Sequence, residues 1–221
     1  MGNLTALGLR YGLYLAVGLG VGMVGREYAR ASVAARLGDP TPRLWGRLTL
    51  SPRPWFEPFG SGLLPILILL LWAVGASLRP PPFAYAKPAP VDPSYLRRGA
   101  RDVVLVSIAG PIANVVLALI GSLPLRAGLS GEAALVPAAF VFANLSLAVF
   151  HLLPIPGLDG ARLVALLLPP EAREVYRNLD RYLPLFIILV VFLLAGPVYS
   201  IVYSLVRPLC RTVGGSGCIV I

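Results

Sequence analysis

The stretch VVLVSIAGPIANVVLALIGSLPL, from Val103 to Leu125, contains no charged side chain. It is at least as long as the ~20 residues that an α-helix needs to cross a bilayer. Similar uncharged stretches are Gly60–Leu78, Ala133–Phe150 and Leu183–Val206, with a weaker one at Tyr11–Gly25. We therefore predict an all-α polytopic membrane protein, with residues 1–221 forming a single membrane domain.

The composition agrees with lipid as the solvent of this chain. Hydrophobic residues make up 57% and charged residues only 13%, with a mean hydropathy of +0.79. A soluble domain carries about 25% charged residues. The net charge of +9 comes almost entirely from Arg, because Lys87 is the only Lys. These Arg residues lie between apolar stretches, where they anchor helix ends, so we expect the lipid bilayer as a partner and no nucleic acid.

The distribution of Arg also predicts the topology. If every apolar stretch crossed the membrane, the basic connectors 26–53 and 79–101 would lie on opposite sides, against the positive-inside rule. If Gly60–Leu78 instead enters and returns, both connectors share one side with the basic segment 162–181. We therefore predict that Gly60–Leu78 is re-entrant.

The remaining segments follow from local patterns. The first helix should run from Tyr11 to about Leu37, because Gly38, Asp39 and Pro40 follow it. Residues 47–51 alternate in polarity, which predicts a short β segment after that helix. The C-terminal membrane helix is expected over 183–206, followed by a short tail.

Few polar side chains lie within or beside the apolar stretches, and these are the candidates for function. They are Arg26, Glu27, Arg30, Asn114, Asn144, His151 and Asp159. Asp159 belongs to LLPIPGLDG (residues 152–160), in which two Pro and two Gly interrupt the helix. Interrupted backbone at membrane depth is tolerated where it lines a cavity.

A series of motifs gives these residues a context. In chain order they are REYAR (26–30), LGDPT (37–41), GRLTLSP (46–52), AKPAPV (86–91), AGPIAN (109–114) and FHLLPIPGLDG (150–160). Together they resemble the site-2 protease family of intramembrane zinc metalloproteases. The resemblance covers residues from about 11 to 170 and implies a family-like core of membrane helices.

The resemblance also assigns roles to individual positions. The family carries H-E-x-x-H where this chain has Arg26, Glu27 and Arg30, so Glu27 occupies the position of the general base. The two family His residues and the Asp matching Asp159 bind zinc, and of these ligands only Asp159 is retained. Arg offers only donors and stays protonated. We therefore expect no zinc cofactor, and we expect Arg26 and Arg30 to supply the counter-charge for Asp159.

Three functions remain under consideration. We predict a non-catalytic, multi-pass member of the family, located in a prokaryotic cell membrane, that binds transmembrane segments of other proteins. The alternative is an active intramembrane zinc metalloprotease with altered ligands, drawn from His151, Asp159 and either Glu27 or Glu57. A transporter ranks last, because the sequence contains no inverted repeat to accompany its interrupted helices.

Overall fold

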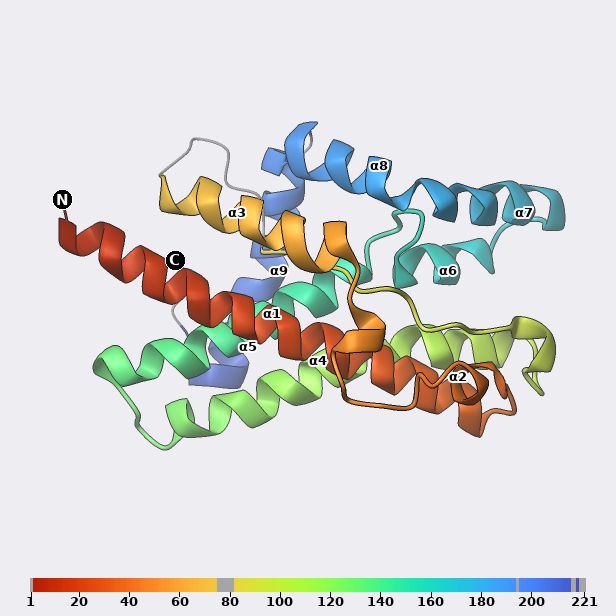
Figure 1. Cartoon of the computed structure of the whole chain (residues 1–221), viewed down its shortest axis with the longest axis horizontal. Helices are drawn as coiled ribbons and strands as arrows, with labels where there is room; N and C mark the ends of the chain where they lie inside the picture. The colour runs from red at the N-terminus through yellow and green to blue at the C-terminus, as the bar shows by residue number, and fades with distance from the viewer. Residues whose placement is uncertain (1, 75–81, 194, 216–217, 219–221) are drawn as a thin grey trace.

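The core is a packed group of long helices, seen in a computed structural model that describes residues 2–74, 82–193, 195–215 and 218 (Figure 1). Helix α1 (Gly2–Arg36) packs against α4 (Ala100–Arg126) and α5 (Leu135–His151), and these two also pack against each other. Helix α9 (Ala195–Gly214) covers α5 and α4. The described ranges contain no β-strand, so the prediction of an all-α protein is confirmed for them.

Two helices in the described ranges are long and apolar enough to cross a membrane. They are Ala100–Arg126, with a mean hydropathy of 2.5, and Gly131–His151, with 2.1, which joins the 3₁₀ turn η4 (Gly131–Ala134) to α5. Helix α1 adds an apolar stripe, in which Leu13, Val17 and Val21 are 59%, 64% and 44% exposed. Their spacing of four residues places them on one helix face.

Small and amide side chains hold α1 and α5 close together. A Cβ at Gly18 would lie 2.9 Å from the Cβ of Ala143, and one at Gly22 would lie 2.7 Å from Asn144 Oδ1. Asn114 on α4 donates from Nδ2 to the carbonyl of Gly22 at 3.2 Å and to Asn144 Oδ1 at 3.0 Å. Amide hydrogen bonds of this kind join helices inside apolar surroundings.

The short β segment expected over residues 47–51 is not formed. The Arg47 guanidinium instead donates to the Pro54 carbonyl and lies 5.1 Å from the ring centroid of Trp55. The Trp55 indole donates from Nε1 to the Thr49 carbonyl at 3.0 Å. Side chains therefore close this segment into a loop, in which Arg47 is buried and Leu50 is exposed.

The apolar stretch that follows returns to its starting point. The π-turn η2 (Pro58–Leu63) continues into α3 (Leu64–Ala73). Further along, the backbone N–H of Tyr85 donates to the Gly60 carbonyl at 3.1 Å, and that of Lys87 to the Trp55 carbonyl at 2.8 Å. The chain that leaves at Gly60 is therefore back beside it at Tyr85. Residues 75–78 of the expected re-entrant stretch lie outside the described residues.

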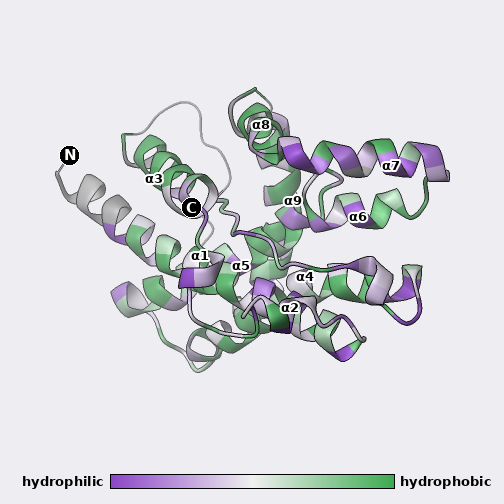
Figure 2. Cartoon of the chain, turned by 45° about the vertical axis from the view of Figure 1, so that its right-hand side comes forward, coloured by the Kyte–Doolittle hydropathy of each residue, from purple (hydrophilic) through white to green (hydrophobic). Residues whose placement is uncertain are grey.

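Short elements connect and cover the core. They are α2 (Thr41–Leu44), η1 (Arg53–Trp55), η3 (Pro93–Tyr95), α6 (Asp159–Ala165), α7 (Pro170–Asn178), η5 (Leu179–Tyr182), α8 (Leu183–Ile188) and η6 (Leu189–Leu193). Figure 2 shows α7 as mainly hydrophilic, whereas α3 and α8 are mainly hydrophobic. Together α6 and α7 form the arm that carries Asp159.

The C-terminal helix expected over 183–206 is divided between α8, η6 and α9. Pro197, in the first turn of α9, has no N–H to donate to the carbonyl of Leu193, which favours a break or kink in the helix near this point. In Figure 1, α8 and α9 accordingly run in different directions.

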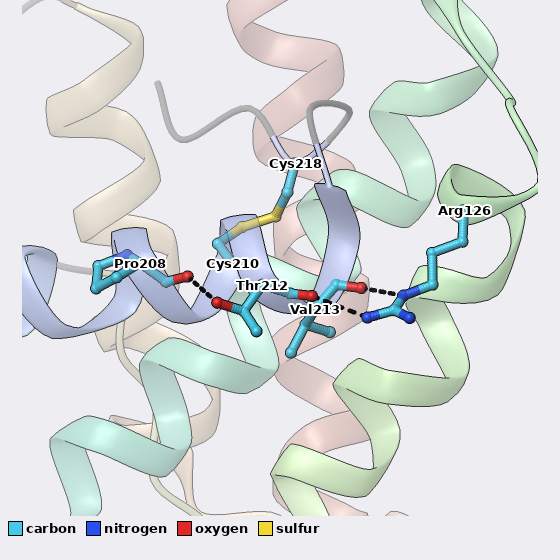
Figure 3. Close-up of a disulfide and its surroundings, with 6 residues drawn as sticks. All are labelled: Arg126, Pro208, Cys210, Thr212, Val213 and Cys218. Carbon is cyan, nitrogen blue, oxygen red and sulfur yellow. Dashed lines mark hydrogen bonds between the residues drawn. A yellow bond between two sulfur atoms is a disulfide. The ribbon is translucent and has the colours of Figure 1, made fainter.

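The end of α9 is fastened by two cysteines and one arginine (Figure 3). Cys210 and Cys218 form a disulfide. Arg126, at the end of α4, donates from Nε to the Val213 carbonyl at 2.6 Å and from Nη2 to the Thr212 carbonyl at 2.8 Å. The last turn of α9 is thus tied to the end of α4.

Candidate functional site

Two arginines and two carboxylates meet in one buried cluster, which we call the charge cluster: Arg26, Glu27, Arg30 and Asp159. Each is 3% exposed or less. Arg26 donates from Nη1 to Glu27 Oε1 at 2.7 Å and from Nη2 to Asp159 Oδ2. Arg30 donates from Nη1 to Glu27 Oε2 at 3.0 Å, and its Nε lies 3.3 Å from Asp159 Oδ1. Both guanidinium groups therefore contact both carboxylates.

Helix geometry places the α1 members of the cluster. Arg26 and Arg30 are four residues apart and share one face of α1, with Glu27 beside them. Asp159 arrives from the first turn of α6, after the interrupted segment that follows α5. A Cβ at Gly160 would lie 2.1 Å from the Leu152 carbonyl oxygen, so this turn requires glycine.

The extended connector before α4 supplies a fifth contact. The backbone N–H of Ala89 donates to Glu27 Oε2 at 2.7 Å. Ala89 lies between Pro88 and Pro90, which have no N–H to donate. A proline at position 90 also disfavours helical backbone at Ala89, which keeps the segment extended. The connector therefore presents a single donor to Glu27.

Helix α4 approaches the cluster through Gly110. A Cβ at this position would lie 3.2 Å from Arg30 Cδ, 3.3 Å from Asp159 Oδ2 and 3.4 Å from Arg26 Nη2. These contacts are tighter than a side chain normally makes, so the absence of a Cβ leaves the space that the ion pairs fill.

The positive and negative charges of the cluster are equal in number, but some of its N–H donors have no acceptor. Two guanidinium groups face two carboxylates, which removes the large cost of an isolated buried charge. Nevertheless, Arg26 Nε and Arg30 Nε and Nη2 are buried without a hydrogen-bond acceptor among the described residues. Each such donor retains a penalty of about 1–3 kcal/mol until an acceptor reaches it.

The other sequence candidates lie outside the ion pairs of the cluster, although His151 is near enough to interact electrostatically with Arg26 and Asp159. His151 is buried, with Nδ1 donating to the Leu147 carbonyl at 2.9 Å and Nε2 without a partner in the described ranges. Asn114 and Asn144 bond to each other and to helix backbone, as described above, and so join helices. Glu57 accepts from the Gly60 N–H and is not part of the charge cluster.

Arginine at positions 26 and 30 offers no lone pair to a metal ion. Among the described residues, no three His, Cys, Asp or Glu side chains gather where they could hold a metal. The ligands expected from the resemblance would sit where two guanidinium groups now lie, and guanidinium has no lone pair to offer. Of the alternative ligand set, His151 and Asp159 interact electrostatically, whereas Glu57 bonds to the Gly60 N–H and Glu27 and Asp159 contact Arg.

Sequence reasoning missed the contributions of Ala89 and Gly110. The signal for Ala89 was the alternation of Pro in KPAP, residues 87–90, which isolates one N–H. For Gly110 the signal was weaker, since small residues in a membrane helix indicate close packing without naming the neighbour.

Comparisons with known proteins identify relatives of this chain. It is 35% identical over 179 residues to "Putative zinc metalloprotease YwhC" of Bacillus subtilis, an alignment that covers 76% of this chain and 75% of the relative. It is 34% identical over 185 residues to "Putative zinc metalloprotease Rip2" of Mycobacterium tuberculosis, covering 81% and 67%. No family model matches the chain, and no solved structure matches it.

Proposed function

The chain belongs to the site-2 protease family, and we propose that it is a non-catalytic member that binds transmembrane segments of other membrane proteins without cleaving them. The observation that carries the proposal is the charge cluster. Its guanidinium groups lie against Asp159 and Glu27, the two carboxylates that the resemblance assigns to the metal and to the general base. In this proposal Arg26 and Arg30 take the place of the zinc ion.

Charge supports this replacement. A zinc ion contributes two positive charges next to the family's carboxylates, and two guanidinium groups contribute the same. The fold can therefore keep Asp159 buried at 2% exposure without a metal. Glu27 also contacts both guanidinium groups and accepts from the Ala89 N–H. A carboxylate bound in this way is not available to take a proton from water.

The unpaired guanidinium donors support a binding role. The N–H groups at Arg26 Nε and at Arg30 Nε and Nη2 lack acceptors in the described part of the chain. A transmembrane segment that unwinds locally exposes backbone carbonyls, which need donors in apolar surroundings. The arginine N–H groups would donate hydrogen bonds to these carbonyls, so that both would have partners. Such a segment would be held at the cluster but would meet no activated water.

The proposal includes several membrane crossings, with the arginine-rich connectors on the cytoplasmic side. The return of the chain to Gly60 at Tyr85 supports a re-entrant Gly60–Leu78 stretch. The Cys210–Cys218 disulfide supports the same orientation, because it lies at the end of α9, which Arg126 ties to the end of α4 opposite the basic start at Arg101. Disulfides persist on the outer side of a cell membrane and not in the cytosol.

Site-specific photocrosslinking separates binding from cleavage. Leu152 is a suitable position for the photoreactive residue, because its side chain is exposed and it lies at the start of the turn that carries Asp159. With the probe at Leu152, a co-expressed single-span membrane peptide should crosslink intact, and its length on a gel should be unchanged. The matched control places the probe at exposed Leu123, near the other end of α4. Equal crosslinking at both positions, or a shortened peptide, would contradict the proposal.

A further inference from the structure

A cavity of about 330 Å³ lies beside the charge cluster, between the connector before α4, the first half of α4, and α6 and α7. This volume is at the lower end of the about 300–1,000 Å³ typical of small-molecule sites. Figure 1 shows α6 and α7 lying over this half of α4. Most of its wall is apolar, and Val91, Leu96, Val103 and Leu166 contribute to it.

Two polar groups in the wall have no partner in the described part of the chain. Ser107 lines the cavity, is 1% exposed, and its Oγ makes no hydrogen bond. Arg162 also lines the cavity, and among the described residues its guanidinium has no hydrogen bond or ion pair within contact distance. A buried hydroxyl without a partner is costly unless a ligand supplies one, and the partly exposed Arg162 guanidinium can bind the same ligand.

The other polar residues of the wall are already engaged. Arg173 donates to the carbonyls of Ala165, Leu166 and Leu168. Asp180 accepts from the Gly157 N–H at 2.8 Å. Of the basic and hydroxyl side chains in the wall, the Arg162 guanidinium and the Ser107 hydroxyl therefore remain for a ligand.

Electrostatics favours an anion at this position. The nearby Arg30 charge, followed by burial, lowers the pKa of Arg162 to about 10. The cavity wall carries Arg162 and Arg173 against the single carboxylate of Asp180. One added negative charge would balance this excess, and a planar carboxylate matches the two parallel donors of a guanidinium group.

We propose that this cavity is a binding site for a short aliphatic monocarboxylate, with the carboxylate on Arg162 and Ser107 and the chain against the apolar wall. The site is separate from the charge cluster, since it uses a different arginine and requires no membrane segment. Its position next to α6 means that a bound carboxylate would also fix the arm that carries Asp159.

The test is calorimetric titration of the full chain, reconstituted in lipid nanodiscs, with octanoate. Empty nanodiscs correct for partition into lipid, and octanol tests the requirement for the charge. We expect saturable binding of octanoate at one site per chain, at least tenfold weaker in Arg162→Gln. The Arg101→Gln variant is the matched control, because it removes the same charge from an exposed position on α4.

Two further variants keep the test decisive if Arg162→Gln does not fold. Arg162→Lys keeps the charge but loses the paired donors, so binding should weaken by less than in Arg162→Gln. Val103→Phe narrows the cavity from its apolar side and should weaken octanoate binding while leaving Arg162 in place. The proposal is overturned if octanoate does not bind saturably, if octanol binds equally well, or if the folded variants bind octanoate as the unchanged protein does.

Discussion

Helix α4 is held at two places by different chemistry. At Gly110 it packs on the charge cluster, where Arg26 and Arg30 are each 3% exposed and are matched by carboxylates. At its end, exposed Arg126 donates only to neutral carbonyls of α9, beside the disulfide (Figure 3). Burial therefore determines whether an arginine requires a counter-charge. Water can solvate Arg126, whereas the buried pair depends on counter-charges.

The largest effect should come from removing the shared carboxylate. Asp159→Asn leaves two buried guanidinium groups facing only Glu27, so we expect a loss of about 3–5 kcal/mol in the free energy of unfolding. Unfolding in detergent measures it. Combined with Arg30→Gln, the loss should be smaller than the sum of the single losses, by about 0.5–3 kcal/mol. Strictly additive losses would mean that Arg30 and Asp159 do not interact.

An intermediate effect is expected from the disulfide. Replacing Cys210 and Cys218 together by Ser removes a crosslink that closes a short loop, which the chain-entropy relation values at about 2–3 kcal/mol. Heating the oxidised, reduced and doubly substituted proteins in detergent compares them. The reduced and substituted forms should unfold at the same lower temperature. An unchanged midpoint would show that the disulfide does not hold α9.

The disulfide and the connector before α4 should also lie on opposite sides of the membrane. After reduction, the thiols of Cys210 and Cys218 should react with a membrane-impermeant maleimide added outside the cell. The thiol introduced by Lys87→Cys, at an exposed position of the connector, should not react. Labelling of both from one side would overturn the proposed topology.

The smallest effect should come from Arg126→Gln. Because Arg126 is exposed and bonds to neutral carbonyls, its loss should lower the free energy of unfolding by less than about 1 kcal/mol. The same detergent unfolding measures it, with exposed Arg43→Gln as the control for a lost surface charge. A loss of unfolding free energy as large as that of Asp159→Asn would mean that the exposed end of α4 depends on its arginine as strongly as the buried charge cluster does.

The sequence predicted the meeting of Arg26 and Arg30 with Asp159 because ordered motifs located all three, and a buried carboxylate requires a cation. It could not predict that Ala89 would donate to Glu27, since that contact depends on where the connector crosses α1. The expected β segment over 47–51 failed because the Arg47 and Trp55 side chains close the loop. Nothing in the spacing of Cys210 and Cys218 indicated a disulfide, which forms only because α9 ends beside its own tail.

In the proposed function, two arginines take the place of the metal. Elemental analysis of zinc per chain tests it most directly, applied to the unchanged protein and to the Arg26→His, Arg30→His double variant. We expect no stoichiometric zinc in the unchanged protein. We expect zinc to bind to the double variant, which restores two lone-pair donors four residues apart beside Asp159. About one zinc per unchanged chain, lost on Asp159→Ala, would contradict it.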